Sequence, residues 1–160
     1  MTEPDTYFAP ATRLDQGDVY LQTIKILGLR SAIQVLNILP NLVTILNVER
    51  QIVFTNKAFT KYLETKNFDD GLGLRSGELI DCIHANDHIN GCGTGKDCKY
   101  CGAVLTLLKS QETGVKQESN AKITIKKDGK QIPLDFHIIA SPITVDNEVF
   151  YIIVLTEYSK

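Results

Sequence analysis

Four cysteines between positions 82 and 101 are the residues of this chain best suited to chemistry. Cys82, Cys92, Cys98 and Cys101 are separated by nine, five and two residues. A two-residue gap, as between Cys98 and Cys101, lets both sulfurs bind one metal ion. A tetrahedral zinc site or a four-cysteine iron–sulfur site needs four sulfurs, the number that this stretch supplies. The spacing therefore indicates a metal site, although it does not match the paired knuckles of an ordinary zinc ribbon.

The residues around the cysteines also suit such a site. Glycines allow the unusual backbone angles by which a loop wraps a metal and aims its N–H groups at sulfur. The flanking glycines are Gly91, Gly93, Gly95 and Gly102. Lys96 and Lys99 would offset the negative charge of thiolates. A helix expected from Ala103 would lower the pKa of Cys98 and Cys101 through its positive end, which favours ligand and nucleophile chemistry alike.

Three interpretations of the cysteines compete. In the first, which the ligand count favours, all four hold an iron–sulfur cluster or a zinc ion. In the second, Cys98 and Cys101 form a reversible thiol–disulfide switch, because their gap is the usual redox spacing. In the third, Cys82, with or without Cys101, is a buried small apolar residue and the others are incidental. An enzyme with Cys92 or Cys101 as nucleophile and His84 as base is the weakest interpretation, since no motif supplies an acid to orient the histidine.

Length, charge and hydropathy describe the setting of these thiols. The chain has 160 residues, of which 43% are apolar, and this composition is typical of one compact domain. A net charge of −2 gives no reason to expect a general nucleic-acid or anionic-membrane binder. The N-terminal segment lacks the apolar core of a secretory signal peptide, so we expect a cytoplasmic, reducing location, where clustered thiols are more often ligands than permanent disulfides. The longest uninterrupted apolar run, Val149 to Leu155, is too short to span a bilayer.

The N-terminal part predicts a flexible leader followed by one amphipathic helix. Residues 1–17 contain prolines, a glycine and scattered charges without periodicity. From 18 to 39 apolar residues recur at helical spacing, and Pro40 ends the helix. The seam consists of Val19, Ile26, Leu29, Ile33 and Leu36. Such a seam fits either a coiled-coil dimer contact or a helix packed on its own domain.

The following segment predicts a β-hairpin and two helices. Two β-type runs, 42–46 and 51–55, flank a polar turn. Asn56 can cap the next helix through its side-chain oxygen. The apolar stripe of that helix is Ala58, Phe59, Tyr62 and Leu63. Residues 69–73 are expected to form a loop, and an apolar helix over 103–109 follows the cysteines.

The C-terminal third predicts three antiparallel strands. Residues 121–125 and 132–138 alternate apolar and polar side chains around the two-residue turn Asp128-Gly129. Residues 149–155 are apolar on both faces, as a covered central strand is. The element order predicts an α+β domain with a five-stranded antiparallel sheet, helices on one face and an N-terminal amphipathic helix.

This layout resembles a PAS sensor domain over about residues 29–157. The resemblance is carried by ILPNLVTILNVERQIVFTNKAF, with Asn56 at the start of a helix, and by IKKDGKQIPLDFHIIASPI followed by a strand ending in LTEYS. It implies a PAS domain over 40–160, with a sheet whose concave face is covered by helices and holds a ligand or cofactor. It also implies a sensory or interaction module of a signal-transduction protein, such as the sensory part of a histidine kinase, rather than an enzyme.

The same resemblance also indicates which cofactors are favoured or disfavoured for this domain. Flavin-binding photosensory members carry an Asn-Cys-Arg-Phe-Leu-Gln run that this sequence lacks, so flavin is disfavoured. Haem-binding members need an axial ligand, usually a histidine beside the sheet; His84 and His88 lie in that region but are more often ordinary polar residues. His137 alternates with Phe136 and Ile138 and is expected on the solvent face of a strand.

The sequence thus predicts a cytoplasmic PAS sensor that reports redox state, oxygen or metal supply. Cys82, Cys92, Cys98 and Cys101 would bind the iron–sulfur cluster or zinc. The resemblance further implies a homodimer through the N-terminal helix, around the seam residues from Ile26 to Leu36, and an output kinase or regulator domain in cis or trans. The alternative is a PAS module that binds a small organic ligand or only dimerises, with the cysteines holding a structural zinc.

Overall fold

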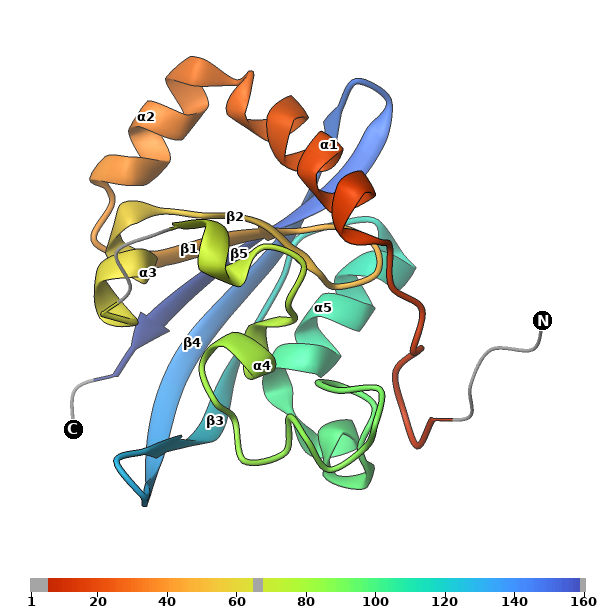
Figure 1. The fold of residues 1–160 in the computed structure, drawn as a ribbon, viewed down its shortest axis with the longest axis vertical. Helices are drawn as coiled ribbons and strands as arrows, with labels where there is room; N and C mark the ends of the chain where they lie inside the picture. Colours follow the sequence, from red (N-terminus) through yellow and green to blue (C-terminus); the bar gives the residue numbers. More distant parts are fainter. Residues whose placement is uncertain (1–5, 65–67, 159–160) are drawn as a thin grey trace.

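A five-stranded antiparallel sheet forms the centre of the computed structural model, which describes residues 6–64 and 68–158. The strand order is β2-β1-β5-β4-β3, so the last strand lies in the middle (Figure 1). The strands are β1 Leu42–Leu46, β2 Ile52–Thr55, β3 Gln117–Lys127, β4 Lys130–Val145 and β5 Glu148–Glu157. This architecture confirms the predicted α+β class and sheet.

The described residues also form seven helical segments, which pack around the sheet. They are α1 Gln16–Leu27, α2 Arg30–Ile38, α3 Lys57–Tyr62, η1 Phe68–Gly71, α4 Ser76–Leu79, η2 Lys96–Tyr100 and α5 Gly102–Thr113, where η marks a 3₁₀ helix. Helices α3, α4 and α5 lie in front of the sheet in Figure 1, and α1 and α2 run along its β2 edge. Within the described part of the chain, none of these helices has the length and apolar character needed to cross a membrane.

The predicted hairpins and the central strand are confirmed. In the first hairpin Thr44 pairs with Thr55, and in the β3–β4 hairpin Lys127 pairs with Lys130 across the turn. Asp128 and Gly129 both have positive φ, 53° and 76°, which a two-residue turn between twisted strands requires. The run over 149–155 lies within β5, which hydrogen-bonds to β1 on one side and β4 on the other.

The single helix predicted over 18–39 is wrong, because two helices meet at a break. Helix α1 ends at Leu27 and α2 begins at Arg30. Gly28 caps α1 through its N–H, which donates to Ile24 O at 3.1 Å, and Leu29 has the non-helical angles φ −82° and ψ 62°. Glycine has a weak helix propensity and commonly ends helices, which explains the break.

Burial of the seam residues favours packing on the protein's own domain. Val19 and Ile26 are fully buried in the core, while Ile33 and Leu36 are partly buried against it and Leu29 is exposed. The exposed large apolar side chains of α1 and α2 are instead Tyr20, Leu21, Ile24, Leu27, Val35 and Ile38. A dimer through α1 and α2 stays a prediction. Val19, Ile26, Ile33 and Leu36 pack on the protein's own domain, so they are not free to form its contact surface.

Asn56 joins three elements and confirms the predicted cap. Its Oδ1 accepts from the N–H of Phe59 at 3.0 Å, at the start of α3, and from the N–H of Val43 at 3.1 Å, in β1. Its Nδ2 donates to the carbonyls of Leu36 and Asn41 at 2.8 and 3.0 Å. The side chain is fully buried, so each of its polar atoms depends on these partners.

Replacing Asn56 with alanine is expected to lower the free energy of unfolding by about 3 kcal/mol, because the cap and two buried carbonyls lose their partners. Urea unfolding measures this change. The control Asn37→Ala removes one hydrogen bond, accepted from Lys57 N–H at 3.0 Å, and should cost under about 1 kcal/mol. Equal losses for both variants would contradict the junction role of Asn56.

Residues 6–15, which belong to the predicted flexible leader, make defined contacts with the rest of the domain. The N–H groups of Tyr7 and Ala9 donate to Thr94 O and Gly93 O, both at 3.0 Å. Ala9 is only 1% exposed. The sequence pattern did not indicate these contacts, because their partners lie more than eighty positions away; the outer limits of the leader and of the 40–160 domain stay predictions.

Candidate functional site

The four cysteines line one cavity, as the metal interpretation requires. This cavity has a volume of about 320 Å³ and lies between the segment 82–101 and strand β3, whose Lys122, Ile123 and Thr124 form the opposite wall. Among the cysteines, Cys98 is buried and the other three are half-buried. All four are free thiols in the structure.

Different elements place the four sulfurs around this cavity. Cys82 follows α4 and forms an isolated β-bridge with Ile125 of β3. Cys92 lies in the loop before η2, and Cys98 lies within η2. Cys101 is the residue that precedes the first turn of α5. We call residues 82–101 the cysteine loop.

Backbone N–H groups point at three of the four sulfurs. The Cys92 sulfur accepts a hydrogen bond from Gly77 N–H and the Cys82 sulfur one from His84 N–H. The Cys101 sulfur accepts from Ala103 and Val104, the first N–H groups of α5. Hydrogen bonds of this kind stabilise the charged form of sulfur and tune metal–thiolate centres. The start of α5, at Gly102, thus places two backbone N–H groups at the Cys101 sulfur.

Burial nevertheless raises the thiol pKa values, which corrects one prediction. For Cys101, loss of hydration and the neighbouring Cys98 outweigh the two N–H donors of α5, so its pKa is raised rather than lowered. Burial likewise raises the pKa of Cys82, and it raises that of Cys92 to about 12. A redox-active cysteine needs a lowered pKa to supply thiolate at neutral pH. Burial thus favours the protonated thiol at Cys82, Cys92 and Cys101, and each of them would lose its proton on binding a metal.

The sulfurs do not form a preorganised zinc site. Within residues 6–64 and 68–158, no three cysteine sulfurs lie within 4.8 Å of one another. Tetrahedral zinc with bonds of about 2.3 Å brings its sulfurs to about 3.8 Å from one another. An iron–sulfur cluster spaces its cysteine sulfurs more widely, since iron and sulfide atoms lie between them. The four sulfurs would therefore have to move closer together to hold one zinc ion.

Two buried arginines lie under the cysteine loop. Arg75 is 1% exposed, and its guanidinium donates to backbone carbonyls at 2.9 to 3.5 Å. The acceptors are the carbonyls of Glu49, Asn90, Cys92, Pro10, Ala11 and Thr12. Arg50 is 5% exposed and donates to Pro10 O at 3.0 Å and to Cys92 O at 3.2 Å. Sequence reasoning missed both residues, because nothing in their neighbourhood separates them from surface cations.

Positive charge is in excess next to Cys92. Burial, together with the nearby charges of Arg50 and Arg13, lowers the pKa of Arg75 to about 10, while Glu78 and Cys92 act in the opposite sense. Burial also lowers the pKa of Arg50, and Cys92 is the strongest opposing influence. Buried charge is costly without a partner of opposite sign. A group of metal-bound thiolates would supply that negative charge.

Glu78 connects the arginines to the cysteine loop. Its carboxylate accepts hydrogen bonds from the side chain of Arg13 and from the backbone N–H groups of Arg75 and Cys92. Burial alone would raise the pKa of Glu78, but the Arg13 hydrogen bond and these two N–H donors lower it below its ordinary value of 4.5.

The lowered pKa of Glu78 predicts a pH-dependent contribution to stability. The contribution is complete above about pH 4.5 and is lost as the pH falls through the folded-state pKa, which lies lower. The difference in unfolding free energy between wild type and Glu78→Gln should therefore shrink between pH 6 and pH 3. Urea unfolding across this range measures it, with Glu112→Gln on the exposed side of α5 as control. A constant difference would contradict the assignment.

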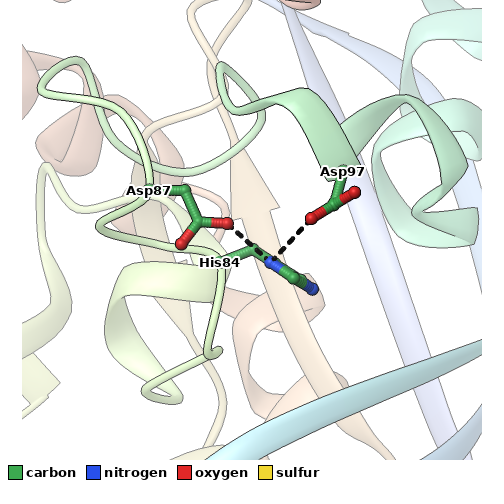
Figure 2. Close-up of side chains that lie close together, drawn as sticks. All are labelled: His84, Asp87 and Asp97. Atoms are coloured by element: carbon green, nitrogen blue, oxygen red, sulfur yellow. Dashed lines mark hydrogen bonds and ion pairs between the residues drawn. The ribbon is translucent and has the colours of Figure 1, made fainter.

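His84 lies at the edge of the cavity within a group of acidic residues. Figure 2 shows its imidazole facing the carboxylates of Asp87 and Asp97. The Nδ1 atom lies 2.6 Å from Asp87 Oδ2 and 3.7 Å from Asp97 Oδ2. These side chains are more than a third exposed, and His84 Nδ1 forms a hydrogen bond with Asp87. Asp87 is thus an orienting acid that the sequence analysis did not find.

The two remaining histidines lie away from the sulfurs. The ring of His88 makes an edge contact with Tyr7, with ring centroids 5.7 Å apart. His137 lies on β4, is one-third exposed and interacts with Asn120 and Glu118. This position agrees with the predicted solvent face.

A second, apolar cavity lies between the sheet and α5, where the PAS resemblance predicts a ligand. It has a volume of about 70 Å³, and its walls include Phe59, Leu107 and Ile153 as well as Cys92 and Cys101. Pockets for small organic ligands usually measure about 300 Å³ or more. The core cavity is therefore small for an organic ligand.

Comparison with known proteins gives matches in structure alone. No family model and no curated protein sequence matches the chain. The PAS domain of nitrogen regulation protein NR(II) from Vibrio parahaemolyticus superposes with a TM-score of 0.55 at 16% identity, covering 79% of this chain and 97% of that one. A PAS domain from Colwellia psychrerythraea gives 0.54 at 12% identity, with 83% and 97% covered.

A third match is part of a longer regulator. The Vibrio cholerae VqmA structure gives a TM-score of 0.53 at 14% identity and covers 81% of this chain but 51% of that one. Each of the three matches covers about four fifths of this chain. Together with the strand order, they show that this chain has the fold of PAS domains.

Proposed function

We propose that this chain is the PAS-fold sensor module of a signal-transduction protein and that its four-cysteine cavity holds an iron–sulfur cluster. The observation that carries the proposal is the convergence of Cys82, Cys92, Cys98 and Cys101 on one cavity, with backbone N–H groups directed at three of their sulfurs. Iron–sulfur clusters are held by four cysteine thiolates and tuned by such hydrogen bonds. The signal would be redox state or oxygen.

The residues of the chain fit such a group in charge as well as in donor type. Metal-bound thiolates bring negative charge, and Arg50 and Arg75 supply buried positive charge beside Cys92. Glycine at position 77 lets its backbone approach the Cys92 sulfur, since a Cβ there would lie 2.7 Å from it. When bound, a cluster would supply one-electron redox chemistry or sensitivity to oxygen.

Two of the solved structures with this fold support a role in signalling. Solved structures with this fold include a PAS domain from a two-component sensor histidine kinase and that of NR(II). We therefore infer an output kinase or regulator domain, in cis or in trans, for this module. A homodimer would use the exposed apolar side chains of α1 and α2, such as Leu21, Ile24, Val35 and Ile38.

The competing function is a ligand-binding or dimerising PAS module in which the cysteines hold a structural zinc. One observation favours it: Cys98 and Cys101 have the two-residue gap of zinc ligands, with Cys101 N–H donating to Cys98 O at 3.0 Å. Two observations speak against it: among the described residues no three cysteine sulfurs lie within 4.8 Å of one another, and the core cavity is small for an organic ligand.

Metal analysis of anaerobically purified protein tests the proposal. We expect iron and acid-labile sulfide in similar amounts, with broad visible absorption that disappears in each of the four Cys→Ser variants. The control Asp128→Asn, in the β3–β4 turn, should keep both. Zinc without iron would overturn the cluster in favour of the structural zinc. Failure to bind either metal, including after incubation with ferrous iron and sulfide, would overturn both.

A further inference from the structure

We propose that residues 7–14 form a latch that couples the conformation of the cysteine loop to the start of helix α1. The latch runs along the cysteine loop and ends two residues before α1 begins at Gln16. This proposal deepens the proposed function, on which it rests for the nature of the signal. The coupling itself depends only on contacts within the protein.

Backbone pairing attaches the first half of the latch. Tyr7 N–H and Ala9 N–H donate to Thr94 O and Gly93 O, at 3.0 Å each. The acceptors are the two residues that directly follow Cys92. A shift of Cys92 therefore moves the partners of the latch.

Buried guanidinium groups attach its middle. Arg75 donates both to latch carbonyls, including Thr12 O at 2.9 Å, and to loop carbonyls, including Asn90 O at 3.0 Å. Arg50 bridges Pro10 O and Cys92 O in the same way. Each arginine thus binds latch and loop at once, and neither segment can leave without exposing unpaired carbonyls or a buried charge.

The end of the latch is held by side chains. Arg13 pairs with Glu78 and donates to Asn90 O at 3.2 Å, and Glu78 accepts from Cys92 N–H at 3.0 Å. Leu14 exchanges two hydrogen bonds with the side chain of Gln51, at 2.9 and 3.1 Å. Both backbone polar groups of Cys92 therefore belong to the network that holds the latch.

These shared contacts make latch and loop one cooperative unit. A modification that is favourable only in the open loop therefore also releases the latch. Conversely, removing the latch favours opening of the loop. Both effects have the same coupling free energy. Asp15 caps α1 directly after the latch, with its carboxylate 2.8 Å from Asp18 N. Release would thus remove the support on the N-terminal side of α1 and expose Arg75.

Alkylation of Cys92 in metal-free, reduced protein tests the coupling. The Cys92 side chain is half-buried and its sulfur packs against Gly77, so its alkylation rate rises when the loop opens. Deleting residues 2–14 should raise the rate at Cys92 at least tenfold relative to deleting residues 2–5, which leaves every latch contact in place. Arg13→Gln should raise it severalfold relative to Arg30→Gln, a matched change on α2. Peptide mass spectrometry identifies the modified cysteine.

The reverse direction provides a second measurement. The chain without deletion, alkylated at Cys92, should exchange the amide hydrogens of Tyr7 and Ala9 at least tenfold faster than the unmodified chain. Rates at Cys92 within twofold of the controls in both the deletion and Arg13→Gln would overturn the latch, and so would unchanged exchange at Tyr7 and Ala9. Arg13 is one-third exposed, so its variant remains decisive if the deletion fails to fold. Because the protein is metal-free, failure here is distinct from failure to bind iron.

Discussion

Replacing Arg75 with methionine is expected to lower the free energy of unfolding by about 3 to 5 kcal/mol, the largest effect of a single change that the structure predicts. Arg75 is only 1% exposed. Its guanidinium donates to carbonyls of three separate segments: the β1–β2 turn, the latch and the cysteine loop. Methionine fills a similar volume but donates no hydrogen bond, so these buried carbonyls lose their partner. Urea unfolding of the metal-free protein measures the loss.

Two further variants separate hydrogen bonding from charge in this result. Arg75→Lys keeps the positive charge but not the planar fork that reaches several carbonyls, so we expect most of the loss to remain. Arg30→Met, on an exposed position of α2, should change stability by less than about 0.5 kcal/mol. If Arg75→Met is as stable as wild type, the carbonyls have other donors and the junction assigned to Arg75 is wrong.

Replacing Gly77 with alanine is expected to abolish iron binding while leaving the domain folded. A Cβ at this position would lie 2.7 Å from the Cys92 sulfur and 3.4 Å from Cys82 Cβ. The sulfur must then move away from the N–H of Gly77, the donor that it uses. Overpacking of this kind costs about 1 to 3 kcal/mol, which a core of this size can absorb.

The readout for Gly77→Ala is iron bound per chain after anaerobic reconstitution. We expect less than a tenth of the wild-type amount, with cooperative unfolding retained. Gly17→Ala is the matched control, since the nearest atom to its added methyl group is Asp15 Oδ1 at an ordinary 3.4 Å. Wild-type iron content in Gly77→Ala would show that the Cys92 sulfur is free to move and that its contact with Gly77 does not position a ligand.

The elements that local chemistry determines were predictable from the sequence. Alternation in β3 and β4, the Asp128-Gly129 turn and the capping side chain of Asn56 all depend on residues close in the chain, and the structure confirms each. The helix break was also local, but the apolar periodicity on both sides of Gly28 concealed it.

The candidate site could be predicted in its cysteines but not in its surroundings. The four cysteines are identifiable because few residue types bind soft metals and their spacing is short. The burial of Arg75 depends on carbonyls of residues such as Thr12 and Asn90, which are far from it in the chain. The raised pKa of Cys101 has the same origin, because tertiary burial outweighs the local helix start that the sequence reveals.

The place of β5 between β1 and β4 also determines the order in which the cavity can form. The β1–β2 hairpin and the β3–β4 hairpin join only through β5, which follows both of them in the chain, so the sheet closes only after β5 has been synthesised. One wall of the cysteine cavity belongs to β3, which pairs with β4 and is held in the sheet through it. A nascent chain therefore presents its cysteines before their cavity exists. Loading of a metal centre would accompany or follow closure of the sheet, and oxidation of the thiols before that moment would compete with it.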